Sequence, residues 1–302
     1  MRTQNSSVGR IFRILFLVLL GVVPTMCGEY LNLYKRLGTE LNVPVQEQLT
    51  LQNWLQQGAN ACHDAHQRGS DASLHCLREQ IYARAGIEFD SVSAHSVLDL
   101  MPDHLLHSRK GSCVSISFLT MLLAERMGLA FMSVSLPGHV FLNFSGDVNW
   151  EPNRKGYRYT DTEYAVKYQI SPQQFQHLSV TQFEGLFRYE MGNRDLLARN
   201  ASRALLSYQH AAQLWKDPRI AGNMAIVLDK LGKPNTALRI LDSLWQQGER
   251  SEGLVWNKSL LMIRAGNPQA QVLAFVEQAR AYSITSPRLT ALAQRLTMAN
   301  KK

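Results

Sequence analysis

The chain has 302 residues, a length that suits two domains, and its 45% hydrophobic and 19% charged content is that of a globular protein. The formal net charge is +8, and three arginines near the N-terminus supply +3 of it, which leaves a modest +5 on the remainder. No run of Lys and Arg is interleaved with aromatic residues, so the sequence argues against a nucleic-acid-binding protein.

The first 28 residues have the pattern of a secretory leader. Arg2, Arg10 and Arg13 precede a short apolar core, and no Asp or Glu occurs before Glu29. The apolar stretch between Arg13 and Glu29 holds fifteen residues, fewer than the roughly 20 that a membrane-spanning helix needs. We therefore expect export rather than a multi-pass membrane protein.

Three forms of processing are compatible with this leader. Cys27 and Gly28 follow the apolar core and resemble a bacterial lipoprotein cleavage site, at which Cys27 receives lipid, although Met26 departs from the small residue usual there. The alternatives are an uncleaved anchor and simple cleavage. All three place the body of the protein in the cell envelope on the periplasmic side, and the first two associate it with the membrane through its N-terminus.

A helical segment follows, with helices expected over 46–57, 72–85 and 99–106. Of the four cysteines, Cys27 belongs to the leader and Cys113 begins a later helix, which leaves Cys62 and Cys76. This pair is predicted to close a disulfide in an oxidising compartment, and the alternatives are two unpaired core cysteines or, with His66 and His75, a zinc site. The spacing matches no common zinc finger.

Residues 109–144 carry most of the chemical information. Gly111 and Ser112 form a turn and cap, and apolar residues then recur at steps of three and four until Gly128, which predicts a helix that begins at Cys113. A thiolate is the reactive form of cysteine, and a helix N-terminus beside an imidazole favours it. Cys113 is therefore the candidate nucleophile.

Two strands are predicted after this helix. The first covers 131–136, and after Pro137 and Gly138 the second begins at His139, the candidate base. A third antiparallel strand over 148–152 would bring Glu151 to the far nitrogen of His139, where a carboxylate orients the ring. Asn149 and Asn153 are the alternative orienting groups, and His104 and His107 are alternative partners of the thiol. Residues 157–168 are expected to continue the sheet.

This window resembles the transglutaminase-like superfamily, whose core runs from Cys at a helix start to His and an acid on two successive strands. The resemblance rests on Gly111–Ser117, on Met127-Gly128-Leu129, on Pro137-Gly138-His139 and on Glu151-Pro152. Glu151 stands where the family more often has Asp. The resemblance implies an α+β domain over residues 29–180, with Cys113, His139 and Glu151 as its catalytic residues.

The second half repeats at a period of 34 residues. Residues 223–234 match residues 257–268, with Asn at the start, an apolar stripe, and Gly-x-Pro at the end. This residue pattern and the length of the repeating unit are similar to those of tetratricopeptide repeats. The similarity predicts an all-α domain over residues 185–302. The first helix pair, with helices over 189–199 and 202–215, is expected to dock on the preceding domain. The array either binds an extended peptide or protein partner or only buttresses its neighbour.

Together these features predict an exported thiol acyl-transfer enzyme, either a cysteine protease or amidase or an amine-accepting acyltransferase, with a repeat domain that binds protein. We expect no cofactor and no metal, because the thiol and imidazole suffice for this chemistry and no acidic calcium-binding loop occurs. The competing hypothesis is an inactive envelope scaffold, in which the transglutaminase-like domain is a binding module and the repeats recruit a partner.

Overall fold

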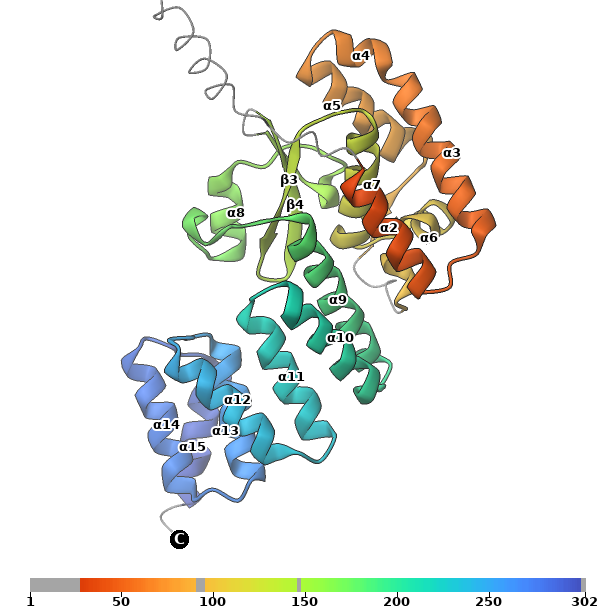
Figure 1. Ribbon diagram of the computed structural model, residues 1–302. Coiled ribbons are helices and arrows are strands. Elements are labelled where there is room, and N and C mark those ends of the chain that lie inside the picture. Colours follow the sequence, from red (N-terminus) through yellow and green to blue (C-terminus); the bar gives the residue numbers. More distant parts are fainter. Residues whose placement is uncertain (1–27, 91–95, 146–147, 300–302) are drawn as a thin grey trace, which may run out of the picture.

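The computed structural model describes residues 28–90, 96–145 and 148–299 (Figure 1). The predicted leader, including Cys27, lies outside the described residues except for Gly28. None of the described helices is both long and apolar enough to cross a bilayer.

Before the central helix, the chain is helical apart from two very short strands that pair in parallel. These elements are α2 (Glu29–Glu40), α3 (Val45–Ala61), α4 (His63–Gln67), α5 (Ser70–Arg78), a π-helical turn (Glu79–Arg84), β1 (Glu88–Phe89), a 3-10 turn (Leu98–Leu100), α6 (Pro102–Ser108) and β2 (Lys110–Gly111). The helix predicted over 72–85 is thus an α-helix that widens into a π-turn, and the one predicted over 99–106 is displaced toward Pro102 because proline favours the first turn of a helix.

A four-stranded antiparallel sheet separates two helices. Its order is β5 (Val148–Trp150), β4 (His139–Phe144), β3 (Phe131–Leu136) and β6 (Gln176–Leu178). Helix α7 (Cys113–Arg126) covers one face and α8 (Asp161–Tyr168) the other (Figure 1). Strand alternation explains both layers, since Val140 and Leu142 join the core on the α7 side whereas Phe141 packs with Tyr164 of α8.

The prediction that residues 157–168 continue the sheet is wrong. Only Tyr157 forms an isolated bridge, with Glu151, and α8 begins at Asp161. Thr160 and Glu163 form a capping box, in which each side chain accepts a hydrogen bond from the other residue's backbone N–H. This local stabilisation favours a helix start over a strand. The fourth strand is instead β6, which pairs with β3.

One buried core joins the sheet domain to the helices that follow it. Its buried residues extend from Tyr30 to Val227 and include members of α9 (Val180–Leu197) and α10 (Ala201–Leu214). The Phe183 ring of α9 lies 5.8 Å from the Tyr30 ring and 5.4 Å from the Phe118 ring. The first helix of the repeat region therefore begins at Val180, before the predicted start, and its N-terminal turn packs in the core of the sheet domain.

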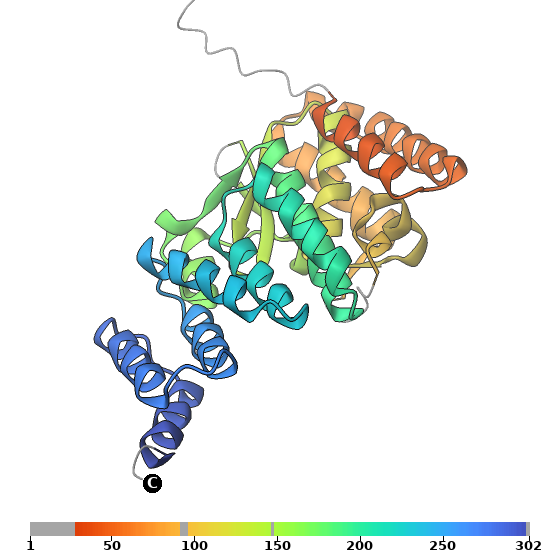
Figure 2. The ribbon, with the colours of Figure 1, turned by 60° about the horizontal axis from the view of Figure 1, so that its bottom comes forward.

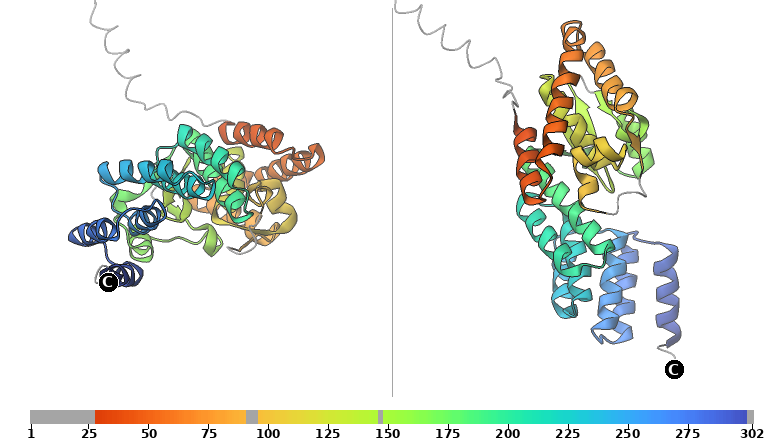
Figure 3. Two further views of the ribbon diagram at one scale, coloured as in Figure 1. Left: turned by 90° about the horizontal axis from the view of Figure 1, so that it is seen from below. Right: turned by 90° about the vertical axis from the view of Figure 1, so that its right-hand side faces the viewer.

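The remaining helices form a second stack. They are α11 (Pro218–Lys230), α12 (Pro234–Gln246), α13 (Glu252–Arg264), α14 (Gln269–Ala281) and α15 (Pro287–Ala299). A separate buried cluster, which starts at Ala225 and ends at Leu289, holds them together. Figures 2 and 3 show these helices extending away from the sheet domain in order along the chain. Their pairing agrees with the helix-turn-helix pattern read from the 34-residue period.

Candidate active site

Local packing places Cys113 at the start of α7. The Ser112 side chain accepts a hydrogen bond from the Ser115 N–H and so caps the helix. Gly111 is required there, because a Cβ at this position would lie 2.5 Å from a Leu105 methyl and 2.6 Å from the Ser115 hydroxyl. The turn before Cys113 is thus closely packed against the side chains of Leu105 and Ser115. Cys113 is a free, half-exposed cysteine.

The β3–β4 hairpin and the next strand bring the histidine and the acid together. His139 pairs with Leu136 across the tight turn, in which Gly138 has φ 72°. His139 Nε2 lies 2.8 Å from Glu151 Oε2, and both side chains are at most 1% exposed. With Nε2 engaged by the carboxylate, Nδ1 is the ring nitrogen left for the thiol.

Interactions with Cys113 and with Glu151 both raise the pKa of the His139 imidazole. Burial is the largest single influence and lowers the pKa of His139, but side-chain hydrogen bonds to Cys113 and to Glu151 outweigh it and raise the pKa to about 9. The ring is therefore favoured as an imidazolium at neutral pH. The His139 imidazole is thus hydrogen-bonded to Glu151 and interacts with the Cys113 thiol.

Glu151 is kept ionised inside the core by three donors. Burial raises its pKa, but the hydrogen bonds to His139, to the Tyr164 hydroxyl at 2.7 Å and to the Asn153 N–H at 2.8 Å bring the pKa below its usual value. Asn153 therefore assists Glu151 through its backbone and does not replace it. Such a carboxylate can fix the imidazole tautomer and stabilise its positive charge.

An aromatic wall that sequence reasoning missed surrounds the histidine. The Tyr168 ring stacks on the His139 ring at 5.1 Å with an interplanar angle of 8°, and Phe141 stacks on Tyr164 at 4.0 Å. Both tyrosines come from α8, the segment that was expected to be a strand. The capping-box pattern at Thr160 and Glu163 is the sequence signal that would have placed them on a helix.

The alternative candidates have other partners. His104 forms an ion pair with Asp99 at 3.0 Å, and His107 is exposed. The Asn149 side chain hydrogen-bonds to Asn143, to Asp161 and to the Tyr159 carbonyl oxygen. None of these interactions involves Cys113 or His139, so the described contacts single out Glu151 as the partner of the imidazole.

Cys62 and Cys76 are joined by a disulfide that links the end of α3 to α5. Their sulfur atoms are therefore not available to a metal ion. Across the described residues, no group of three or more His, Cys, Asp or Glu side chains is arranged to hold a metal. The histidines near the disulfide, His63 and His66, line a surface pocket beside Arg126.

Comparison with known proteins supplies one match. The family described as the transglutaminase-like superfamily matches residues 47–201, slightly more than half of the chain, and no tetratricopeptide family matches the helical region beyond it. No curated protein and no solved structure matches the chain. The matched residues contain Cys113, His139 and Glu151.

Proposed function

Because this chain belongs to the transglutaminase-like superfamily, we propose that it is a thiol acyl-transfer enzyme with Cys113 as nucleophile, His139 as acid and base, and Glu151 as the orienting carboxylate. The observation that carries the proposal is the buried contact of 2.8 Å between His139 and Glu151, together with the interaction with the Cys113 thiol that helps to raise the pKa of His139. A purely structural histidine has no need of a buried carboxylate on one side and a half-exposed thiol on the other.

The proposed reaction proceeds through a thioester. The Cys113 sulfur attacks the carbonyl carbon of a peptide or glutamine-type amide, the C–N bond breaks, and His139 donates its proton to the leaving amine. Water or a second amine then attacks the thioester, His139 takes up its proton, and the sulfur leaves. Water as acceptor gives hydrolysis, as in a cysteine protease or amidase, and an amine gives amide exchange.

Two features support stabilisation of the intermediates. The Cys113 and Val114 N–H groups in the first turn of α7 have no carbonyl partner within the helix, so they are available to the carbonyl oxygen as it becomes negative. The imidazolium charge is stabilised by Glu151, whose lowered pKa keeps it ionised well below neutral pH. No step in this sequence calls for a bound cofactor.

Alkylation of Cys113 by iodoacetamide tests the proposal. We expect the folded protein to react much faster than the urea-unfolded protein at pH 7, because a cysteine beside an imidazolium is generally more reactive than a free one. His139→Ala should slow the reaction by on the order of 10²-fold, the usual contribution of such a group. His177→Ala is the matched control, because His177 is an exposed histidine of the same sheet.

A second measurement tests turnover. An activated ester should form a thioester on Cys113 that mass spectrometry detects, and Cys113→Ala should remove it. If the folded thiol reacts no faster than the unfolded one and forms no thioester, the inactive scaffold becomes the better interpretation. In that case the helical region, which we propose binds protein, would carry the function.

We also propose that the protein works in the cell envelope on the periplasmic side, anchored at its N-terminus. The disulfide between Cys62 and Cys76 supports this, because such bonds persist in oxidising compartments. Labelling of cells with palmitate tests the lipid anchor. Label that survives Cys113→Ala and vanishes with Cys27→Ala would support it, and absence of label from the parent would favour an uncleaved anchor or simple cleavage.

A further inference from the structure

A groove of about 1050 Å³ lies between the sheet domain and the helices that follow it. One wall is formed by the end of β3 and by the segment after α8, and the other by the facing sides of α9, α11 and α13. Its lining is rich in carboxamides, namely Gln169, Gln173, Gln174, Gln176, Asn223 and Asn257. A carboxamide can both donate and accept a hydrogen bond, as a peptide group does.

Two turns of the groove wall are close in sequence to residues of the candidate active site. Pro137, in its wall, is two residues from His139, and Gln169 directly follows Tyr168, whose ring stacks on the imidazole. The turns that precede His139 and follow Tyr168 therefore both contribute residues to the groove wall. Arg219 ties this wall to α11, because it donates hydrogen bonds to the Leu136 carbonyl oxygen at 2.7 Å and to the Ser135 hydroxyl at 3.1 Å.

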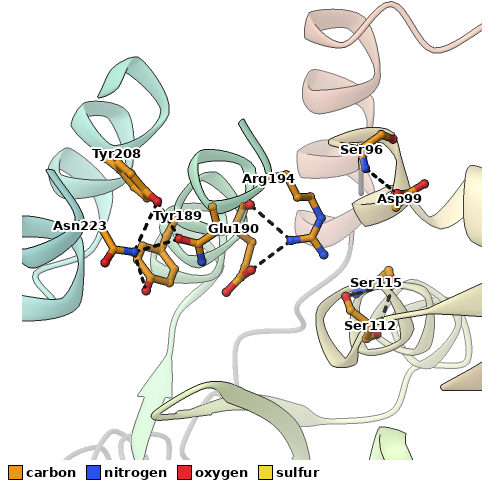
Figure 4. A network of polar contacts seen from close by, with 10 residues as sticks. Ser96, Asp99, Ser112, Ser115, Tyr189, Glu190, Arg194, Tyr208 and Asn223 are labelled. Atoms are coloured by element: carbon orange, nitrogen blue, oxygen red, sulfur yellow. Dashed lines mark hydrogen bonds and ion pairs between the residues drawn. The ribbon is translucent and has the colours of Figure 1, made fainter. Parts of the chain in front are cut away.

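The helical wall presents polar groups at a regular interval. Tyr189, Asn223 and Asn257 are spaced 34 residues apart and line the groove from every second helix, namely α9, α11 and α13. The Asn223 Nδ2 donates to the Tyr189 hydroxyl and to Asn193 Oδ1, which fixes the amide in place (Figure 4). Its Oδ1 accepts no hydrogen bond from the described residues, and the Asn257 side chain likewise has no hydrogen-bonding partner among them. Both amides are available to a ligand.

Two glycines keep the groove open between these asparagines. A Cβ built on Gly222 of α11 or on Gly253 of α13 meets no atom within 4 Å. Neither glycine has the positive φ that would itself explain the residue. Glycine inside a helix costs about 1 kcal/mol relative to alanine. Their positions on the groove floor allow another backbone to approach closely, which is a common use of glycine.

One cation of the groove lacks a carboxylate. The Arg250 guanidinium lies 3.9 Å above the Trp245 ring and donates to the carbonyl oxygens of Trp245 and Glu249. Among the described residues no carboxylate lies within 4.0 Å of it, whereas Arg219 is paired with Asp217. The Glu249 carboxylate of the same groove accepts a hydrogen bond from the Ser251 N–H. Arg250 is therefore a preoriented cation that suits an acidic side chain of a ligand.

We propose that this groove binds an extended, acidic stretch of the polypeptide whose acyl group reacts with Cys113. This inference rests on the proposed function and assigns a substrate class to it. The asparagine amides bind the backbone of the substrate, the glycines admit that backbone, and Arg250 selects an acidic residue. The helical region is then a substrate-binding extension of the active site rather than an independent module for recruiting partners.

A tethered electrophile tests the inference. An acidic, unstructured peptide that carries a terminal iodoacetamide is compared with free iodoacetamide, and alkylation of Cys113 is followed by mass spectrometry. If the peptide occupies the groove, tethering raises the local concentration of the electrophile, and the peptide probe should react on the order of 10²-fold faster than the free reagent. A neutral version of the peptide, with amides in place of carboxylates, should gain less, and Arg250→Gln should remove the difference between the two peptides.

Gly222→Leu and Gly253→Leu are expected to narrow the groove without disturbing the fold, because a Cβ at either position meets no atom within 4 Å. Each should reduce the ratio of the tethered rate to the free rate to near 1. Ala270→Leu is the matched control, since it adds a side chain to an exposed position of α14 outside the groove, and the ratio should stay at the parent value.

The outcomes separate the two proposals. A slow reaction of free iodoacetamide with the parent protein contradicts the proposed enzyme. A fast free reaction in which the tethered peptide gains nothing, or in which both groove variants keep the parent ratio, overturns the assignment of this groove to the substrate.

Discussion

The sheet domain and the distal helices hold their polar groups in opposite ways. In the sheet domain, His139 and Glu151 are buried and satisfy one another, and the residues around them come from segments far apart in the chain. In the helices, Asn223 and Asn257 stand on the wall of an open groove at a 34-residue interval set by local pairing of helices. Controlling the protonation of an imidazole requires a buried environment to which distant segments of the chain contribute. A surface for an extended ligand can instead be built by repeating one structural unit.

The two hydrophobic cores also differ in the sequence separation of the residues that they bring together. The first extends from α2 through the sheet to α10 and α11, so its residues depend on one another over long separations. The second joins helices that are neighbours in sequence. We therefore expect the first core to unfold cooperatively together with the active site, and the second to open without it.

Truncation of one buried residue in each core gives the largest effects. Phe183→Ala should lower the free energy of unfolding by about 3–5 kcal/mol, and Leu241→Ala by about 2–5 kcal/mol. Both side chains are fully buried, Phe183 in the first core and Leu241 in the second. Hydrogen exchange should accelerate across β3, β4 and α9 in the first variant but only from α11 onward in the second. Equal acceleration of β4 in both variants would show that the two regions unfold as one.

The pH dependence of stability tests the buried pair. The pKa of His139 is raised from its usual 6.5 to about 9, so its stabilisation is fully present below pH 6.5 and is lost as the pH rises through 9. At about 1.4 kcal/mol per pKa unit, this amounts to on the order of 3 kcal/mol. Urea unfolding of the parent should lose this amount between pH 6.5 and 9.5 relative to His139→Gln. Parallel curves for the two proteins would contradict the raised pKa.

Glu151 gives the stability of the folded protein the opposite pH dependence, at acid pH. Its pKa is lowered in the folded protein, so its contribution is present above the usual carboxyl pKa and is lost as the pH falls through the lower folded value. The buried pair should therefore stabilise the sheet domain most between these two limits. The Asp217–Arg219 ion pair of the groove differs from it, because the arginine side chain is 26% exposed.

Removal of the Tyr164 hydroxyl should have a smaller effect. Tyr164→Phe deletes the donor to Glu151 Oε2, and a hydrogen bond to a charged group contributes about 1.5–3 kcal/mol. The pKa of Glu151 should rise, which should move the acid limb of the pH–rate profile for thioester formation to higher pH. Tyr159→Phe is the matched control, because its ring packs 5.3 Å from Tyr164 and no hydrogen bond links it to Glu151. A shift of equal size in both variants would exclude a positioning role for the Tyr164 hydroxyl.

The elements that the sequence predicts correctly are those with local signals. Gly111 and Ser112 mark the start of α7, the apolar alternation marks β3 and β4, and the 34-residue period marks the helix pairs. The order Cys113, His139, Glu151 also follows from a helix and two successive strands. These features depend on caps, side-chain periodicity and turns within a few residues, and such signals can be read without a three-dimensional structure.

Other features depend on contacts that no local pattern encodes. The stacking of Tyr168 on His139, the hydrogen bond from Tyr164 to Glu151 and the link from Arg219 to the end of β3 join residues separated by 13 to 83 positions. The same is true of the shared core around Phe183 and of the groove beside Pro137. The sequence by itself determined which side chains are available for the chemistry and on which elements they lie. Only tertiary packing decided which of them meet, because burial and proton position depend on everything that surrounds a group in space.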